Sequence, residues 1–162
     1  MVEMKVKGVA IDATKNNTPV VILTDLEEKR MLPIWVGLYE ANAILMELEN
    51  IPVPRPMTHD LIKNVFETLG AKVTRVGVTK LQEGTFFAQI SLETKDAKYE
   101  VDARPSDAVA LALRVKAPIF VSENVVMEAT IPDEAKINKE HDDLKKWLEN
   151  LKPSDFGKYP IQ

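Results

Sequence analysis

The sequence contains no cysteine, so disulfide bonds, thiolate metal sites and cysteine nucleophiles are all excluded. No apolar run approaches the roughly 18 residues that a membrane-spanning helix needs, and the N-terminus lacks the apolar core of an export signal. A basic excess is also missing: the net charge is −4 at pH 7, whereas proteins that bind nucleic acid through its phosphates usually carry a positive excess. These absences predict a cytoplasmic protein without a membrane span. They also require any phosphate-directed function to rest on a local basic patch or on a bound metal.

Several common catalytic motifs are absent as well. The six glycines form neither a P-loop nor a dinucleotide-binding fingerprint, and no serine lies in a nucleophile-elbow pattern. Classical kinases, Rossmann dehydrogenases and serine hydrolases are therefore poor fits. A chain of 162 residues with 45% hydrophobic and 28% charged residues has the composition of one ordinary globular domain.

What the sequence does contain is a unit that recurs after 67 residues. The identical pairs at this offset are Val6 and Val73, Val9 and Val76, Thr18 and Thr85, Ala41 and Ala108, and Ala43 and Ala110. The apolar residues around Ala41 and those around Ala108 share the i, i+3, i+4, i+7 spacing of one helix face. The pattern predicts an α+β fold with an internally duplicated strand-strand-strand-helix unit that shares one core.

The local patterns predict the elements of each half and their limits. Strands are expected over residues 4–13, 19–25, 30–36, 71–81, 85–93, 97–103 and 119–123. Helices are expected over 39–50, 58–69 and about 106–116, and a stripe of Leu144, Trp147, Leu148 and Leu151 predicts a last helix. Thr58 is the expected N-cap of the second helix and Gly70 its C′ residue. The predicted halves are residues 4–69 and 71–132 of a domain spanning 1–132, with a C-terminal helix and tail over 133–162 packed on the same domain.

Polar residues gather where the proline-rich segment 51–56 enters the second helix. In the run RPMTHD, Arg55 could bind a phosphate, while His59 or Asp60 could act as a general base or a metal ligand. A purely structural alternative is equally simple, because Thr58 would cap the helix and Asp60 would complement its dipole. The residues alone leave both interpretations open.

A second polar group lies at the predicted strand-to-helix junction of the second half, in the run DARPSD. Asp102 and Arg104 would share one side of an extended strand, and grouped carboxylates such as Asp102 and Asp107 suit Mg²⁺. Glu40 occupies the position equivalent to Asp107 in the first half, so the two carboxylates could approach each other and bind metal. The alternative is a helix start with a structural Asp–Arg pair and two acids that complement helix dipoles.

The ordered motifs resemble those of the bifunctional nuclease domain family. They are LPIWVGLYEANAI (32–44), RPMTHDL (55–61), YEVDARPSDAVALALR (99–114), APIFVSE (117–123) and LKPSDFGKY (151–159). The resemblance covers nearly the whole chain and implies a small α+β domain that forms a homodimer, with the C-terminal aromatic residues as candidate interface residues. It also implies a nuclease that acts on both DNA and RNA. Many relatives carry a UvrB/UvrC-type hairpin after this domain, and we expect none within the residues up to Gln162.

The combined hypothesis is a phosphodiesterase that uses Mg²⁺ or Mn²⁺. The expected catalytic residues are His59, Asp60 and Asp107, the phosphate-binding residues Arg55 and Arg104, and the metal ligands Glu40, Asp102 and Asp107. A non-catalytic dimeric binding or regulatory domain and a phosphohydrolase of small metabolites are the alternatives. The motifs do not distinguish a nucleotide from a polynucleotide.

Overall fold

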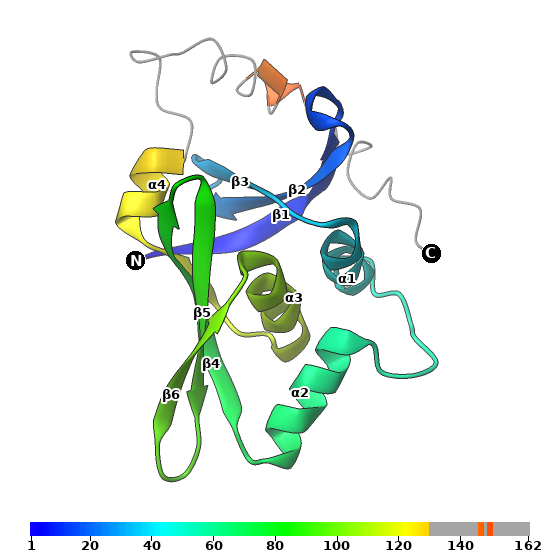
Figure 1. Ribbon diagram of the computed structural model, residues 1–162, viewed down its shortest axis with the longest axis vertical. Helices are drawn as coiled ribbons and strands as arrows, with labels where there is room; N and C mark the ends of the chain where they lie inside the picture. The colour runs from blue at the N-terminus through cyan, green and yellow to red at the C-terminus, as the bar shows by residue number, and fades with distance from the viewer. Residues whose placement is uncertain (130–145, 148, 151–162) are drawn as a thin grey trace.

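The computed structural model describes residues 1–129, 146, 147, 149 and 150, and its elements follow the predicted order closely (Figure 1). The strands are β1 (Val2–Asp12), β2 (Thr18–Asp25), β3 (Met31–Trp35), β4 (Lys72–Gln82), β5 (Thr85–Glu93), β6 (Lys98–Ala103) and β7 (Ile119–Val121). The helices are α1 (Leu38–Leu48), α2 (Thr58–Thr68), α3 (Pro105–Val115) and α4 (Glu123–Ala129), with a 3₁₀ turn, η1 (Ala13–Lys15), after β1.

The seven strands form one sheet in the order β3-β2-β1-β7-β4-β5-β6. β1, β2 and β3 make one antiparallel meander, and β4, β5 and β6 make another. β7 lies between the two meanders, antiparallel to β1 and parallel to β4. The α+β class is therefore confirmed, and the sheet is continuous from the first half of the chain to the second.

β2 and β5, β3 and β6, and α1 and α3 begin 67 positions apart, whereas β1 and β4 begin 70 positions apart. α1 and α3 each have 11 residues, and their first residues, Leu38 and Pro105, are 67 positions apart. The strand pairing differs by two residues: Ile22 pairs with Pro33, whereas Gln89 pairs with Asp102 and not with Glu100. A two-residue shift keeps every side chain on its face of the sheet, because successive residues of a strand alternate between faces. That the halves descend from one duplicated unit stays a prediction.

The core forms between the sheet and helices α1 and α3. α1 packs on β1 and β2, α3 packs on β4 and β5, and α2 packs mainly on α3. Aliphatic side chains fill the space, with Ile44, Leu45 and Leu111 among the most completely buried. α3 is apolar around almost its whole circumference, which is why it is buried on all sides. The contact of α1 and α2 with α3 brings the first turns of the three helices together.

A smaller apolar cluster of Ala10, Val20 and Ile22 forms a separate group of buried residues. The partly buried residues Met31, Trp35 and Trp147 pack against it. Trp147 belongs to the predicted C-terminal helix, whose other predicted stripe residues, Leu144, Leu148 and Leu151, lie outside the described residues. Within the described part of the chain, no helix is long and apolar enough to span a bilayer.

Two local predictions were wrong. The N-cap of α2 is Met57 and not Thr58, because the carboxylate of Asp60 turns back to accept the Met57 N–H at 2.9 Å and satisfies the helix start. The strand predicted to run to residue 123 ends at Val121, and α4 begins at Glu123. Gly70 does follow α2 with a φ of 71°, the left-handed conformation expected of a C′ glycine.

Candidate functional site

The first turns of α1, α2 and α3 each carry an acidic residue at the third helical position. These residues are Glu40, Asp60 and Asp107. An acid at this position is favoured by the partial positive charge at a helix N-terminus. Because the three helix starts lie close together, their carboxylates need cations from neighbouring segments. Two arginines and a histidine supply them.

Arg104, the residue just before α3, joins the carboxylates of the two halves. Its Nε and Nη2 donate to Oδ2 and Oδ1 of Asp107 at 2.8 and 3.2 Å, and Nη2 also lies 2.8 Å from Oε1 of Glu40. The predicted approach of Glu40 and Asp107 is therefore present, with a guanidinium between them. The Arg104 side chain remains 65% exposed, so this end of the cluster faces solvent.

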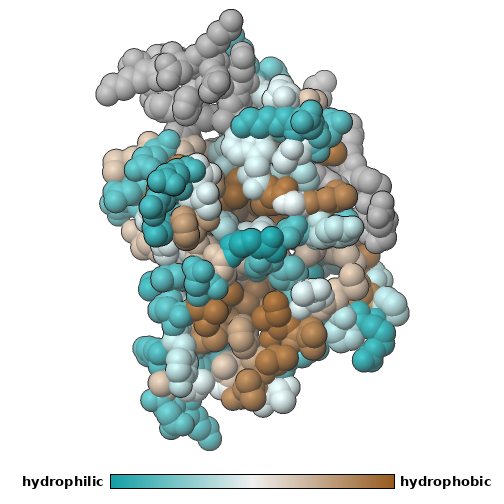
Figure 2. Space-filling model, in the orientation of Figure 1, coloured by the Kyte–Doolittle hydropathy of each residue, from teal (hydrophilic) through white to brown (hydrophobic). Residues whose placement is uncertain are grey.

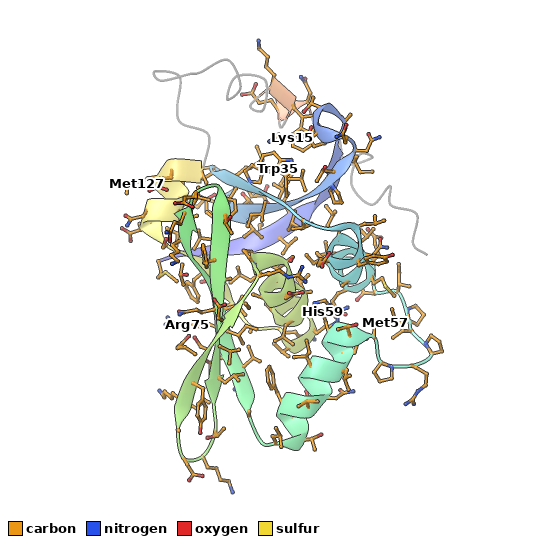
Figure 3. All side chains as sticks on the ribbon, viewed as in Figure 1. Lys15, Trp35, Met57, His59, Arg75 and Met127 are labelled. Carbon is orange, nitrogen blue, oxygen red and sulfur yellow. The ribbon has the colours of Figure 1, made fainter. Side chains whose placement is uncertain are left out.

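His59 lies on the inner side of the cluster, at the start of α2 beside α3 (Figure 3). Its Nε2 is 2.9 Å from Oδ1 of Asp107, and only 9% of its side chain is exposed. Burial would raise the pKa of Asp107, but hydrogen bonds from Arg104 and His59 outweigh it and hold the pKa below its ordinary value. Asp107 is therefore ionised at neutral pH and can only accept a hydrogen bond, which places the Nε2 hydrogen on His59.

Arg114 forms a second ion pair beside the first, and the sequence analysis missed it. Its side chain is 5% exposed and donates to three helices: to Asp60 Oδ1 on α2 at 2.8 Å, to the Ala43 carbonyl on α1 at 3.0 Å, and to the Ala110 carbonyl on α3 at 2.8 Å. The sequence contained a signal for this pair. Arg114 is a cation near the end of a helix that is apolar on almost every side, so it must be buried and needs a partner.

Asp60 connects the two ion pairs because it follows His59 directly in α2. Burial would raise its pKa, but the Met57 N–H and the Arg114 guanidinium hold it below the ordinary value. Arg114 thus holds the first turn of α2 through Asp60, and that turn carries His59 toward Asp107. We refer to Glu40, His59, Asp60, Arg104, Asp107 and Arg114 as the ionic cluster.

Gly37, the N-cap of α1, leaves room for the outer end of the ionic cluster. A Cβ at this position would lie 2.2 Å from Oε2 of Glu40. The backbone φ of −72° is open to any residue, so a larger residue here would have to displace the Glu40 carboxylate and not the turn. Gly37 therefore leaves the space in which Glu40 meets Arg104.

Two predicted site residues are not joined to the cluster. Arg55 is exposed in the proline-rich segment, and Asp102 is exposed on β6, paired with Gln89. The expected Asp102–Arg104 ion pair is not formed, because β6 ends at Ala103 and Arg104 already precedes a helix. Within the described residues, no three His, Asp or Glu side chains are grouped so that they could hold a metal ion. The predicted donor set of Glu40, Asp102 and Asp107 does not fit a metal in this arrangement.

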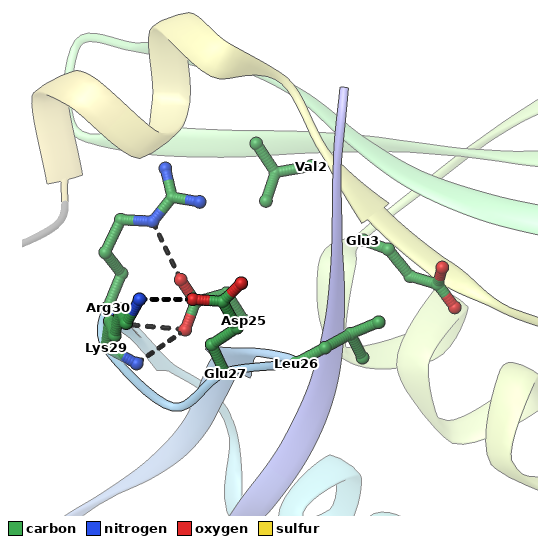
Figure 4. A pocket seen from close by; sticks show the side chains of 7 residues that line it. All are labelled: Val2, Glu3, Asp25, Leu26, Glu27, Lys29 and Arg30. Carbon is green, nitrogen blue, oxygen red and sulfur yellow. Dashed lines mark hydrogen bonds and ion pairs between the residues drawn. The ribbon is translucent and has the colours of Figure 1, made fainter.

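A separate pocket lies at the turn between β2 and β3 (Figure 4). Asp25 accepts hydrogen bonds from the backbone N–H groups of Lys29 and Arg30 and from the Arg30 side chain. Both carboxylate oxygens are thus used by the turn itself. The pocket contains none of the ionic cluster residues, and its Asp25 carboxylate holds the local turn.

Comparison with known proteins places all of the ionic cluster inside a recognised domain. The family model described as "Bifunctional nuclease domain" matches residues 21–134, more than half of the chain. An uncharacterized protein of Mycobacterium tuberculosis (strain H37Rv) is 41% identical over 165 aligned positions, which cover 96% of this chain and 98% of that protein.

Plant proteins match over a shorter region. Bifunctional nuclease 1 of Arabidopsis thaliana is 32% identical over 96 residues, and bifunctional nuclease 1 of Oryza sativa subsp. japonica is 30% identical over 98 residues. These alignments cover 57% and 59% of this chain but only 30% of each plant protein. The family match covers the motifs at 32–44, 55–61, 99–114 and 117–123 but not the one at 151–159, and it spans more than half of the chain, so this chain belongs to the bifunctional nuclease domain family.

Proposed function

We propose that the chain is a nuclease that hydrolyses phosphodiester bonds of DNA and RNA, with the ionic cluster as its active site. The observation that carries the proposal is the connected arrangement of Glu40, Arg104, Asp107 and His59 at three helix starts. All four residues lie within the matched domain. The names of the plant relatives support the reaction class, and the ionic cluster supports the location.

Arg104 is suited to hold the phosphate. Its Nε and Nη2 bind Asp107 and Glu40, whereas Nη1 has no hydrogen-bond partner among the described residues. The two N–H groups of Nη1 can therefore donate to phosphate oxygens while the two carboxylates keep the guanidinium in place. This local cation also offers a way for a protein of net charge −4 to bind a polyanion.

His59 is suited to move a proton. When the neutral imidazole donates its Nε2 hydrogen to Asp107, Nδ1 carries the lone pair and can accept a proton from an attacking water. Asp107 stabilises the imidazolium that results, as a carboxylate does in other acid–base pairs. The His59 side chain is 9% exposed, so the water must reach Nδ1 through the small part of the ring that is open to solvent.

The requirement for Mg²⁺ or Mn²⁺ stays a prediction of the sequence. In the observed arrangement the carboxylates of Glu40 and Asp107 are both bound to Arg104, so the steps above use only the side chains of the chain. A comparison of cleavage in Mg²⁺, in Mn²⁺ and in EDTA decides the question. Activity that persists in EDTA would remove the metal from the hypothesis and leave the ionic cluster unaffected.

The test of the site is Asp107→Asn, assayed on single- and double-stranded DNA and RNA. We expect cleavage to be lost, because the variant no longer holds Arg104 and His59 with a charge. Asp96→Asn is the matched control: Asp96 is exposed in the turn before β6, where only its backbone N–H bonds to Thr94. Because Asp107 also stabilises the fold, thermal unfolding of both variants must be compared. Equal cleavage by Asp107→Asn and wild type would refute the proposed site.

The alternative is a non-catalytic binding domain in which the same ion pairs only hold the helices together. It is favoured by the pairing of every acid in the ionic cluster with an arginine or histidine. Under this interpretation, purified wild type and Asp107→Asn would show the same residual cleavage, and the variant would differ only in stability. Hydrolysis of small phosphorylated metabolites but not of polynucleotides would favour the phosphohydrolase alternative.

A further inference from the structure

Of the large hydrophobic side chains in the described part of the chain, that of Tyr39 is the most exposed. Tyr39 is 80% exposed, although it lies in the first turn of α1, whose later residues Ala41, Ile44 and Leu45 are buried. Its position in the helix does not impose this exposure, because the second residue of α3, Ser106, is only 7% exposed. The aromatic ring of Tyr39 therefore contributes little to the packing of α1.

Tyr39 immediately precedes the residue through which α1 contacts the ionic cluster. Oε1 of Glu40 lies 2.8 Å from Nη2 of Arg104, and the Cα atoms of Tyr39 and Glu40 are about 3.8 Å apart, as in any two consecutive residues. Figure 2 shows hydrophilic side chains on the face of the molecule where β6 leads into α3, and Arg104, which lies at this junction, is 65% exposed. Both the guanidinium and the neighbouring aromatic ring can thus be reached from solvent by one extended ligand.

Charge alone gives the ionic cluster little affinity for a polyanion. The carboxylates of Glu40 and Asp107 already balance the positive charge of Arg104, and the whole chain has a net charge of −4. A single strand held by one arginine would lose affinity with salt at a logarithmic slope of only about 0.7. Affinity for a polynucleotide therefore needs a contact that is not ionic.

An exposed aromatic ring provides such a contact, because a nucleobase can stack on it. Stacking uses the π face that every base has, so it does not depend on the base sequence. It also makes no contact with the 2′-hydroxyl, the group by which proteins distinguish RNA from DNA. The base must be unpaired, however, since a base inside a duplex has to leave its stack before a side chain can reach its face. The ring therefore favours single strands and accepts either sugar.

We propose that Tyr39 binds an unpaired nucleobase of the substrate by stacking while Arg104 holds a neighbouring phosphate, so that single-stranded DNA and RNA are the preferred substrates. This inference rests on the proposed function, because it assigns the substrate of the same site. Tyr39 acts in binding and takes no part in the proton transfer assigned to His59 and Asp107. One contact serves both nucleic acids because it does not touch the sugar.

The test measures the binding of a short fluorescent oligothymidylate by anisotropy, with phosphorothioate linkages that resist cleavage. We expect Tyr39→Ala to weaken binding by about five- to a hundredfold, the contribution of one stacked base. Tyr39→Phe should bind like wild type because it keeps the ring. The loss in Tyr39→Ala should be the same at low and high salt, since stacking releases no counterions. The variant should fold normally, because an exposed tyrosine is replaced by a better helix former.

Tyr99→Ala is the matched control. Tyr99 is also well exposed, at 51%, but it lies on β6 five residues before Arg104, roughly 16 Å away along an extended strand. This variant should bind like wild type. A loss of affinity in Tyr99→Ala equal to that in Tyr39→Ala would overturn the assignment of stacking to Tyr39.

Three further ligands test the stacking on the wild-type protein. The matching oligouridylate should bind about as tightly as the oligothymidylate. A duplex with oligoadenylate, and an abasic sugar-phosphate oligomer, should both bind wild type no better than oligothymidylate binds Tyr39→Ala. Equal binding of the duplex and the single strand, or a wild type that binds no oligonucleotide, would overturn the proposal.

The failure of this proposal can be distinguished from the failure of the proposed active site. If Tyr39→Ala binds oligothymidylate like wild type while Asp107→Asn loses cleavage, only the stacking role is refuted. If Asp107→Asn cleaves like wild type while Tyr39→Ala loses binding, only the active site is refuted.

Discussion

Replacement of Arg114 by methionine removes the cation that holds three helices while keeping a side chain of similar length. Asp60 would lose its main partner, and the carbonyl groups of Ala43 and Ala110 would each lose a donor. Removing one member of a fully buried ion pair costs about 3–5 kcal/mol. Asp60 is 25% exposed and keeps the Met57 N–H, so water relieves part of this cost. We expect a loss of about 2–3 kcal/mol in the free energy of unfolding.

The assay is urea denaturation followed by tryptophan fluorescence, at one protein concentration for all variants. Lys63→Met is the matched control, because Lys63 pairs with Glu67 only at 4.0 Å on the partly exposed side of α2. It should cost less than about 0.5 kcal/mol. Arg114→Lys should fall between the two, because an ammonium cannot donate to three separated acceptors as the planar guanidinium does.

The double variant Asp60→Asn with Arg114→Met separates the ion pair from packing. If the Asp60–Arg114 ion pair accounts for most of the lost stability, the double variant should lose about 1–2 kcal/mol less free energy of unfolding than the two single variants lose together. Strict additivity would show that Arg114 acts through its alkyl chain and the two carbonyls alone. A loss below about 1 kcal/mol for Arg114→Met would refute the argument that this buried cation holds α2 in place.

Two further predictions concern the ionic cluster. Gly37→Ala should displace the Glu40 carboxylate from Arg104 and lower nuclease activity. The free energy of unfolding should change by less than about 1 kcal/mol, because Arg104 is largely exposed. Unchanged activity would show that the Glu40–Arg104 contact is dispensable. The pKa values of Asp60 and Asp107 are lowered in the folded state, so their stabilisation should be complete above the ordinary aspartate pKa of about 3.9 and be lost as the pH falls through the lower folded values. Urea midpoints across this range should decline less steeply for Asp60→Asn than for wild type, and equal slopes would contradict the assignment.

The order of strands and helices could be predicted because the determining patterns are local. The alternation along the strands and the i, i+3, i+4, i+7 spacing around Ala41 and Ala108 can be read from neighbouring residues without knowledge of the tertiary contacts. The N-cap of α2 was predicted one residue too late, at Thr58, because a threonine hydroxyl is a common capping group, whereas the N-cap is Met57, whose N–H donates to the Asp60 carboxylate three residues later. α4 was missed because its seven residues, ENVVMEA, are too few for a helical period to be distinguished from a strand.

The composition of the site was only partly predictable. Glu40, His59, Arg104 and Asp107 were selected from their positions at helix starts, and the structure brings them together. Asp102 was included because the alternation rule was applied past the end of β6, where the backbone turns into α3. Arg114 lies seven residues beyond Asp107, and its pairing with Asp60 depends on how α2 crosses α3. No local pattern contains that information.

The short strand β7 has a consequence for how the molecule folds. Its three residues provide the strand pairing between the β1–β3 meander and the β4–β6 meander, and Val2 pairs with Val121, 119 residues further along the chain. Each meander can close through hairpins of low contact order, whereas the join between them must wait for a long loop to close and for β7 to leave the ribosome. The N-terminal strand therefore remains an open edge through most of synthesis. Its last partner is synthesised only after all six residues of the ionic cluster.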